Sequence, residues 1–353
     1  MDKRYFSDKV VEWYESNKRD LPWRETRDPY KIWLSEVILQ QTRVNQGLPY
    51  YLRFIEKFPN VKSLANASEQ EVLRQWQGLG YYTRARNLHK CAQQVVAQHE
   101  SKFPDSFESL KKLAGIGEYT AAAIASIAFK QNVAVVDGNV FRVLSRIFGL
   151  SDEINSPQGQ KLFKALANDL IDNRHPDLHN QAMMEFGALY CTPKNPACTL
   201  CIFAVGCFAA QKNMQHALPV KAGLKAPRKR YFYYLVVKKG RTLLMNKRGS
   251  RDIWNGMYDF CLTEKEKPLP LKALVQYINL STCSNIKPEN AEISTEYKHV
   301  LTHQVIFSRF IVVEWRNDFG LPNGNLKFYS TKKIGSLPKP VLISRFLEDY
   351  NFL

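Results

Sequence analysis

One stretch, residues 110–144, limits the possible folds of this chain more than any other. It reads LKKLAGIGEYTAAAIASIAFKQNVAVVDGNVFRVL, in which a helical segment ends at Ala114 and an Ala/Ile-rich helix covers 119–129. Between them, the turn from Gly115 to Gly117 is expected to need two residues free of Cβ strain. The pattern predicts a helix–hairpin–helix whose backbone N–H groups can bind a phosphate at a helix N-terminus. An ordinary hairpin of two helices is the alternative.

The same stretch brings a carboxylate to the start of another helix. The apolar run 133–136 predicts a buried segment that ends at Asp137, just before an apolar helix expected over 140–144. A helix N-terminus favours the charged form of a carboxylate, so Asp137 is a candidate functional anion. A simple N-cap is the alternative role of this residue.

Composition indicates a basic, folded protein. The chain has 353 residues, enough for two or three domains, and 45% of them are hydrophobic. A formal net charge of +17 favours a polyanionic partner, with nucleic acid as the leading candidate. The N-terminal residues contain no apolar signal core, and the small-apolar run 121–129 is too short to span a bilayer. We therefore expect an intracellular protein without a signal or transmembrane segment.

A single carboxylate interrupts the apolar section of an early helix. A start signal at Asp28 precedes a helix expected over 30–45, and Glu36 is the only ionisable residue within 32–42. A buried, unpaired carboxylate has a raised pKa, which is the state that a general acid needs near neutral pH. The alternative is a glutamate paired with a buried arginine or a backbone donor.

Two other segments carry residues suited to DNA. The amide of Gln41 can hydrogen-bond base edges or fill a gap in a base stack, although such residues also form solvated helix faces. A second Gly-x-Gly turn, 78–80, is followed by Tyr81 and then by Arg84 and Arg86. An aromatic side chain at a loop tip can wedge between bases while flanking cations grip phosphates. Core packing of a tyrosine is the alternative.

Four cysteines form the most specific motif of the chain. Their spacing is Cys191-x6-Cys198-x2-Cys201-x5-Cys207, and thiolates this close can hold an iron–sulfur cluster or a zinc ion. Zinc sites usually pair their cysteines in two short knuckles, and here only one pair is short. The spacing also differs from ferredoxin motifs, which argues against a dedicated electron carrier.

The C-terminal part of the chain has a different pattern. Residues 217–230 are polar, basic and proline-containing, which predicts a linker. Beyond it, β-rich and aromatic segments alternate with two expected helices, over 271–280 and 342–350. We therefore expect an all-α domain over 1–216, which contains the cysteine loop 191–207, and a separate α+β domain over 231–353.

The chain resembles the helix–hairpin–helix DNA base-excision glycosylases, and within them the MutY branch of adenine DNA glycosylases. The resemblance rests on the cysteine cluster and on LPWR at 21–24, WLSEVILQQT at 33–42, GLGYYTRARNLHK at 78–90, GIGEYT at 115–120 and VDGNVFRVLSR at 136–146. It implies a helix–hairpin–helix glycosylase domain with a [4Fe–4S] subdomain, followed by a Nudix-like domain. It also implies one [4Fe–4S] cluster on the four cysteines and allows a monovalent cation at the hairpin.

The resemblance further implies an activity and the residues that perform it. Adenine opposite 8-oxoguanine or guanine in duplex DNA would be flipped into a pocket, where Glu36 protonates the base and Asp137 stabilises the sugar cation. A monomer in the bacterial cytoplasm, used at the nucleoid, is expected. The remaining implied residues are the pocket hydrogen-bonders Tyr119 and Asn139, the adenine contacts Trp23, Arg24 and Glu185, and the DNA contacts Gln41, Tyr81, Arg84, Arg86, Gly115 and Gly117.

In the C-terminal domain, the resemblance implies recognition of 8-oxoguanine by a loop that is often Phe-Ser-His in the family. This chain has Leu301-Thr302-His303, which keeps a hydroxyl and the imidazole but loses the aromatic ring. A plain strand-connecting turn is the alternative. The expected helix 271–280 has no acidic residue, so nucleotide pyrophosphatase activity is not expected.

Tyr119 argues against the nearest rival activity. Lyase-competent relatives place a lysine at this position, two residues after the Gly-x-Gly turn, as the amine nucleophile. We therefore expect a monofunctional glycosylase, and a bifunctional endonuclease III-like pyrimidine glycosylase/lyase is the alternative. An iron–sulfur DNA-binding sensor without catalysis is a second alternative, which Glu36 in its apolar helix argues against.

Overall fold

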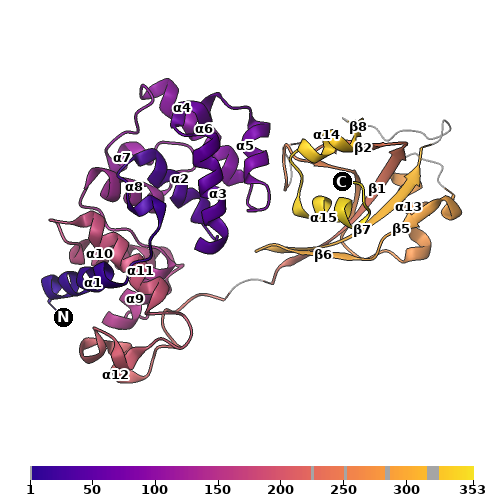
Figure 1. Cartoon of the computed structure of the whole chain (residues 1–353). Coiled ribbons are helices and arrows are strands. Elements are labelled where there is room, and N and C mark those ends of the chain that lie inside the picture. The colour runs from indigo at the N-terminus through magenta and orange to yellow at the C-terminus, as the bar shows by residue number, and fades with distance from the viewer. Residues whose placement is uncertain (1, 224–225, 250–252, 283–286, 316–325) are drawn as a thin grey trace. The chain divides into compact units, whose positions relative to one another are not determined.

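The computed structural model describes residues 2–223, 226–249, 253–282, 287–315 and 326–353 (Figure 1). The chain divides into two compact units, one made of residues 1–67 and 86–223 and the other of residues 68–85 and 224–353. The predicted domain limits at 216 and 231 stay a prediction. In the part of the chain that the structure describes, no helix has the length and apolar character needed to cross a membrane.

Among the described residues 2–223, all regular secondary structure is helical (Figure 1). The α-helices are α1 (Lys3–Asn17), α2 (Pro29–Leu39), α3 (Val44–Lys57), α4 (Val61–Asn66), α5 (Glu69–Trp76), α6 (Thr83–Gln98), α7 (Phe107–Leu110), α8 (Glu118–Phe129), α9 (Gly138–Phe148), α10 (Pro157–Leu170), α11 (Pro176–Leu189) and α12 (Phe208–Lys212). Short 3-10 helices are η1 (Pro22–Arg24), η2 (Cys198–Leu200) and η3 (Ala204–Gly206).

Helix α11 lies at the centre of the packing between several helices of this part of the chain. It packs against α1, α8 and α9, while α8 also packs against α2. Aromatic side chains form the adjoining core, where Phe186 of α11 contacts Trp13 and Phe203 edge to face, with ring centroids 5.0 and 5.5 Å apart. Phe203 lies between two of the loop cysteines and also stacks on Phe6 at 5.0 Å. The cysteine loop is thereby anchored in the helical core.

Two helix boundaries differ from the sequence-based expectation. The helix expected over 30–45 ends at Leu39, because Gln41 adopts a left-handed φ of 55° and the amide of Thr42 bonds the Leu39 carbonyl in a turn. Similarly, α7 ends at Leu110 rather than at Ala114. Gln41 therefore lies in a sharp turn between two helices, and not on a helix face.

The hairpin turn needs one strained glycine rather than two. Gly115 has a φ of +73°, and a Cβ there would lie 2.6 Å from the Cβ of Asn87. Gly117 is extended, with φ −88° and ψ −178°, and a Cβ added to it would meet no atom within 4 Å. Gly117 is thus not required by backbone strain, and its lack of a side chain leaves open space at the start of α8.

The described residues between 226 and 353 form a mixed sheet with helices. The strands are β1 (Arg228–Lys239), β2 (Thr242–Lys247), β3 (Tyr258–Asp259), β4 (Cys261–Lys265), β5 (Ala291–Ile293), β6 (Tyr297–Val300), β7 (Gln304–Glu314) and β8 (Leu326–Ser330). The helices are α13 (Leu271–Thr282), the 3-10 helix η4 (Pro288–Asn290), α14 (Thr331–Ser336) and α15 (Val341–Asp349). The two helices expected over 271–280 and 342–350 are present as α13 and α15, and the β-rich segments expected around them form strands of the sheet.

Successive side chains of β1 point to opposite faces of the sheet, and each face packs against a different helix. β1 pairs in parallel with β7 and antiparallel with β2 and β4, while β7 also pairs with β5 and β6. Tyr233 and Leu235 belong to a cluster with Leu274 of α13. Between them, Tyr234 stacks on Phe310 at 5.1 Å, and Phe310 stacks on an α15 phenylalanine. The period of two along β1 therefore directs alternate side chains to α13 and α15.

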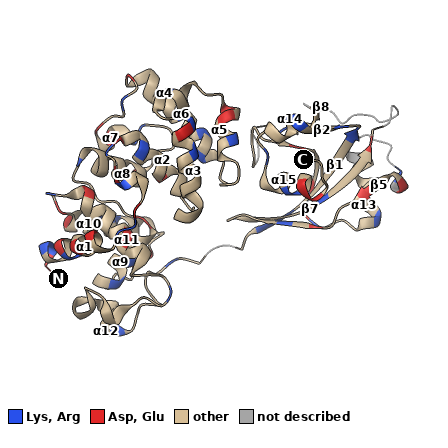
Figure 2. Ribbon diagram, in the orientation of Figure 1, with Lys and Arg blue, Asp and Glu red and all other residues tan. Residues whose placement is uncertain are grey.

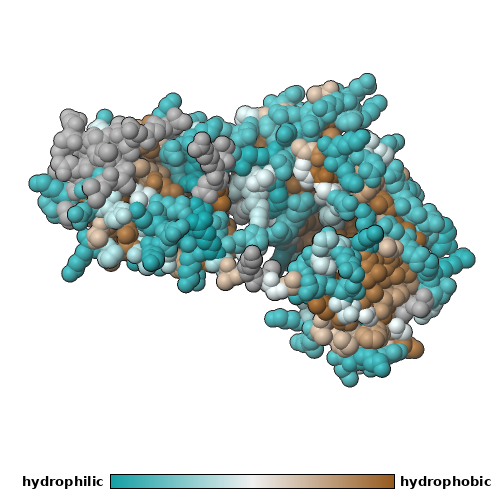
Figure 3. All heavy atoms as spheres, turned by 180° about the vertical axis from the view of Figure 1, so that it is seen from behind, coloured by the Kyte–Doolittle hydropathy of each residue, from teal (hydrophilic) through white to brown (hydrophobic). Residues whose placement is uncertain are grey.

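Charged residues occur along most elements of both units. Figure 2 shows basic and acidic positions interspersed along the helices and strands. The face shown in Figure 3 is mostly hydrophilic, with hydrophobic residues gathered in limited areas.

Candidate active site

Glu36 is buried on α2 and meets one polar partner from another helix. The residue is 8% exposed, and the Tyr119 hydroxyl on α8 donates a hydrogen bond to its Oε2 at 2.6 Å. Burial raises the pKa of Glu36 to about 7, the tyrosine bond opposes this rise, and nearby Asp137 adds to it. In the described residues its hydrogen-bond partner is thus a neutral phenol, and not the arginine or backbone donor considered as an alternative.

Asp137 caps α9 and accepts three hydrogen bonds. Its Oδ1 receives the backbone amides of Asn139 and Val140, both at 2.8 Å, and its Oδ2 receives the Asn139 side-chain amide at 2.8 Å. Burial raises its pKa, while these three bonds and the charge of Arg142 act in the opposite direction. Asp137 is therefore both an N-cap and a buried carboxylate whose described partners are all donors. Such partners favour the anion, because a protonated carboxyl has no acceptor among them.

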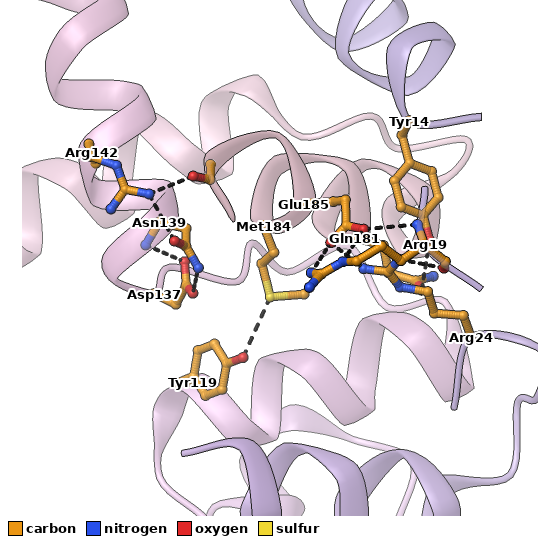
Figure 4. Close-up of polar contacts among 11 residues, drawn as sticks. Tyr14, Arg19, Arg24, Tyr119, Asp137, Asn139, Arg142, Gln181, Met184 and Glu185 are labelled. Carbon is orange, nitrogen blue, oxygen red and sulfur yellow. Dashed lines mark hydrogen bonds and ion pairs between the residues drawn. The ribbon is translucent and has the colours of Figure 1, made fainter. Parts of the chain in front are cut away.

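Arg142, one turn further along α9, fixes the orientation of Asn139. Its Nη2 donates to Asn139 Oδ1 at 2.9 Å and to the Gly187 carbonyl at 2.6 Å, and its Nε donates to the Cys191 carbonyl at 2.8 Å (Figure 4). Because the amide oxygen faces Arg142, the amide nitrogen faces Asp137. A Cβ at Gly187 would lie 2.6 Å from the Asn139 Cβ, so this approach of α9 to α11 requires glycine.

Glu185 of α11 lies in a cage of arginine donors (Figure 4). Its carboxylate accepts from the backbone amide, Nε and Nη2 of Arg19 at 3.0, 2.9 and 2.5 Å, and from Nη1 and Nη2 of Arg24 at 2.8 and 2.6 Å. Burial raises the pKa of Glu185, but these bonds overcome it and lower the pKa to about 2. The Arg24 guanidinium also lies 5.4 Å from the centroid of the Tyr14 ring.

One cavity of about 420 Å³ brings these groups together. That volume suits a small aromatic ligand. Its walls include all seven residues predicted for catalysis and adenine contact, namely Trp23, Arg24, Glu36, Tyr119, Asp137, Asn139 and Glu185. They come from η1, α2, α8, α11 and the start of α9.

The polar and sulfur-containing residues that the sequence reasoning missed include three that line the cavity and Arg142, which orients Asn139. Arg19, Gln181 and Met184 line the cavity, and the Tyr119 hydroxyl contacts Met184 Sδ at 3.5 Å (Figure 4). Arg142 carried a usable signal, because it follows Asn139 at the helical spacing i, i+3. Nothing local in the sequence pairs Arg19 with Glu185, which are 166 positions apart.

The predicted DNA contacts have different environments. Gln41 is exposed, and Tyr81 is 43% exposed with a left-handed φ of 48°. Arg84 lies 5.1 Å from the Trp76 ring centroid, and its Nη2 donates to the Leu79 and Gly80 carbonyls at 3.5 and 3.4 Å. Arg84 thus stabilises its own loop. Arg86 is half-buried.

The four predicted cluster ligands line one cavity. Cys191, Cys198, Cys201 and Cys207 surround it together with apolar residues, Arg146 and Gln215. No set of three or more His, Cys, Asp or Glu residues in the described ranges is arranged for a single metal ion. Arg146 contacts this loop directly, since its Nη1 donates to the Thr192 carbonyl at 2.7 Å and lies 3.5 Å from Cys191 Sγ. An all-thiol donor set around one apolar cavity fits an iron–sulfur cluster.

The predicted recognition loop is the turn that joins β6 to β7. The Leu301 amide bonds the Gln304 carbonyl at 2.9 Å, which closes the turn, and the Arg228 amide bonds the His303 carbonyl at 3.0 Å. Thr302 and His303 are exposed, and the Thr302 hydroxyl shares a hydrogen bond with the Tyr81 hydroxyl. The segment is therefore a strand-connecting turn with an exposed imidazole and with a hydroxyl that is engaged by Tyr81.

Two family models match the chain. Residues 34–168 match the HhH-GPD superfamily of base excision DNA repair proteins, and residues 232–349 match the NUDIX domain. The structure of a thermostable thymine-DNA glycosylase is similar, with a TM-score of 0.56 and 29% identity over 60% of this chain and 97% of that one. The helical fold is that of a helix–hairpin–helix DNA glycosylase.

Similar sequences identify the family within this class of glycosylases. The adenine DNA glycosylase of Buchnera aphidicola subsp. Acyrthosiphon pisum (strain APS) is 30% identical over 353 residues, 99% of either chain. The adenine DNA glycosylase of Homo sapiens is 42% identical over 228 residues, which are 62% of this chain and 42% of that one. The chain belongs to the adenine DNA glycosylase family, as the resemblance implied.

Proposed function

We propose that this DNA glycosylase hydrolyses the N-glycosidic bond of adenine that is mispaired with 8-oxoguanine or guanine in duplex DNA. The observation that carries the proposal is the single cavity in which Glu36, Tyr119 and Asp137 meet. A base can reach this cavity only after it leaves the helix, and this extrusion costs a few kcal/mol. Exposed Gln41 and Tyr81 are the side chains proposed to fill the resulting gap.

Glu36 is the proposed general acid. A carboxyl with a pKa of about 7 holds its proton near neutral pH and still releases it readily. By family analogy, the proton goes to N7 of adenine, so that the base leaves as a neutral group. Tyr119 donates to Oε2, which leaves Oε1 as the oxygen that carries the acidic proton.

Asp137 is the proposed stabiliser of the sugar cation. Loss of the base leaves positive charge on the deoxyribose, and an anion in a buried cavity stabilises such charge more strongly than water would. The two buried carboxylates therefore divide acid and anion roles according to their partners, a phenol for Glu36 and three N–H donors for Asp137. Water completes the hydrolysis.

The enzyme is proposed to be monofunctional. Tyr119 occupies the position at which lyase-competent relatives carry lysine, and its hydroxyl is engaged with Glu36. A phenol cannot form the Schiff base that a lyase step requires. Borohydride trapping on DNA separates the two activities, because a covalent adduct would support the bifunctional alternative.

Glu185 and its two arginines form the proposed base-recognition wall. The carboxylate accepts bonds from Arg19 and Arg24, which holds both guanidinium groups at the cavity surface. A polar wall fixed in this way discriminates between bases by leaving mismatched donors or acceptors unpaired.

The cysteine loop is proposed to hold one [4Fe–4S] cluster through Cys191, Cys198, Cys201 and Cys207. Four thiolates and apolar lining suit such a cluster, whose role here would be structural. A monovalent cation at the hairpin, action as a monomer, and a place in the bacterial cytoplasm at the nucleoid complete the proposal and rest on the family resemblance.

A single-turnover assay tests the proposal. Duplexes that carry adenine opposite 8-oxoguanine, guanine or thymine are incubated with excess enzyme, and abasic sites are cleaved with alkali. Release of adenine opposite 8-oxoguanine and guanine, but not opposite thymine, is expected. Release of a pyrimidine instead would support the endonuclease III-like alternative, and binding without any base release would support a non-catalytic sensor.

A further inference from the structure

A small cluster of charged groups surrounds the start of α8. The Glu118 carboxylate lies 3.1 Å from Lys164 Nζ of α10 and 3.9 Å from Lys111 Nζ, which follows α7. Both ammonium groups lie over the Phe107 ring, 5.6 and 4.9 Å from its centroid. Glu108 also approaches Lys111 Nζ, at 3.4 Å. Two segments far apart in the sequence, 107–118 and α10, thus place two cations beside the hairpin, with the Glu118 carboxylate between them and Glu108 at Lys111.

This cluster adjoins the backbone groups proposed to bind phosphate. Glu118 is the first residue of α8 and directly follows Gly117, which caps the helix without a side-chain hydrogen bond. The first amides of α8 therefore have no side-chain acceptor from their cap, and the missing Cβ of Gly117 leaves space in front of them. Glu118 itself is 62% exposed, so it places a negative charge where a helix N-terminus favours an anion.

We propose that Lys111 and Lys164 form a second contact with the DNA backbone beside the hairpin, and that Glu118 competes with a phosphate for them. The proposal rests on the proposed function, in which the hairpin binds DNA. Exposed ion pairs contribute little and exchange partners readily, so a phosphate can replace the Glu118 carboxylate. Phe107 keeps both lysine stems in place during this exchange.

The competition has a measurable consequence for affinity. When DNA binds, Glu118 loses two cationic partners and lies near a phosphate of the same sign. The residue therefore weakens binding to any duplex, whatever its sequence, and limits the time spent on undamaged DNA. The contact also affects the salt dependence, because each additional neutralised phosphate releases about one counterion.

Fluorescence anisotropy with an undamaged duplex tests this inference at salt concentrations between about 50 and 200 mM. Glu118→Gln is expected to lower the Kd by about three- to tenfold at low salt and to steepen the salt slope by about one. Lys164→Met and Lys111→Met are expected to raise the Kd and to flatten the slope by about one each. Combined with both lysine substitutions, Glu118→Gln should lose most of its effect.

Glu12→Gln is the matched control, because Glu12 forms an exposed pair with Lys9 at 2.8 Å on α1 and changes the net charge equally. If Glu12→Gln lowers the Kd as much as Glu118→Gln, total charge explains the effect and the inference is wrong. An unchanged Kd in Glu118→Gln, with a normal thermal unfolding curve, also overturns it.

The two proposals fail in different assays. Normal adenine release with no effect of Glu118→Gln on binding would overturn the Glu118 competition and leave the glycosylase proposal standing. Conversely, tight and Glu118-sensitive DNA binding without base release would overturn the proposed reaction while supporting the contact.

Discussion

Glu36 owes its proposed role to the balance between burial and one hydrogen bond. Burial disfavours the carboxylate and raises the pKa to about 7, whereas the Tyr119 hydroxyl stabilises the anion and limits that rise. An acid with this pKa is mostly protonated below about pH 7.

The first prediction concerns the pH dependence of base release. The single-turnover rate should be highest below about pH 7 and should fall as pH rises through the pKa of Glu36, because the acidic proton is then lost. Glu36→Gln should abolish release while DNA binding stays within about threefold of wild type, since the amide keeps the shape without an acidic proton. Substantial activity in this variant would show that another residue is the acid.

The second prediction concerns stability. A carboxyl pKa near 7 in the folded state and near 4.5 when unfolded means that the folded state binds more protons between these values. Stability is therefore lost as pH rises from about 4.5 to 7, by on the order of 3 kcal/mol. Glu36→Gln should raise the Tm relative to wild type more at pH 8 than at pH 5. Glu108→Gln, a change at a 75% exposed carboxylate, should give no such difference.

A third prediction separates the two carboxylates. Asp137→Asn should slow the chemical step by about a hundredfold or more, because a neutral amide cannot balance the sugar cation. In this variant, an N–H of the new asparagine would also face one of the Asn139 amides, which donate to the carboxylate oxygens in the wild-type protein. Rapid-quench single-turnover kinetics measures the step, and a near-normal rate would rule out the electrostatic role.

At the scale of elements, α9 and α11 connect the cavity to the cysteine loop. Arg142 bonds Asn139 at its α9 end and the Cys191 carbonyl at the loop, while Arg146 bonds the Thr192 and Pro193 carbonyls at 2.7 and 3.2 Å. Displacement of the loop would therefore disturb Arg142, which orients Asn139, the hydrogen-bond partner of Asp137.

The fourth prediction follows from this connection. Purified protein should be yellow-brown and contain about four irons, and Cys198→Ser should lose iron, folding yield and DNA binding together. Cys261→Ser changes a half-buried thiol outside the loop and should keep full iron content. Iron is measured by colorimetric assay after anaerobic preparation, and zinc without iron would refute the cluster assignment.

At the scale of the whole molecule, chemistry and recognition of the opposite base are proposed to lie in different parts of the chain. Every residue of the cavity precedes residue 192, whereas Thr302 and His303 are exposed on a turn of the sheet domain. A hydroxyl and an imidazole can hydrogen-bond a modified purine, and such bonds exclude partners that cannot form them.

The fifth prediction tests this division. Thr302→Ala with His303→Ala should narrow the rate advantage of adenine opposite 8-oxoguanine over adenine opposite guanine, with little effect on the latter. In a chain truncated after about residue 225, this rate advantage should be smaller still, while adenine release opposite guanine should remain measurable. Full preference in both variants would place recognition in the helical domain and refute the role of the turn.

Much of the fold could be predicted, because local patterns control it. The apolar patterns predicted α2, α8 and α9, and the change to β-rich aromatic segments predicted the sheet domain. The end of α2 could not be predicted, because the left-handed turn at Gln41 depends on how α2 and α3 meet. The second glycine of the hairpin was also misjudged, since extended backbone at Gly117 is visible only in the structure.

The sequence by itself determined which residues are proposed to carry chemistry, because motif and spacing mark Glu36, Asp137 and the four cysteines as unusual in their surroundings. Only the tertiary structure decided how these residues are partnered. Tyr119 reaches Glu36 across 83 positions, and Arg19 reaches Glu185 across 166. These contacts contribute to the pKa values of Glu36 and Glu185. Desolvation and hydrogen bonding act through space, so both depend on helix packing rather than on neighbours in the chain.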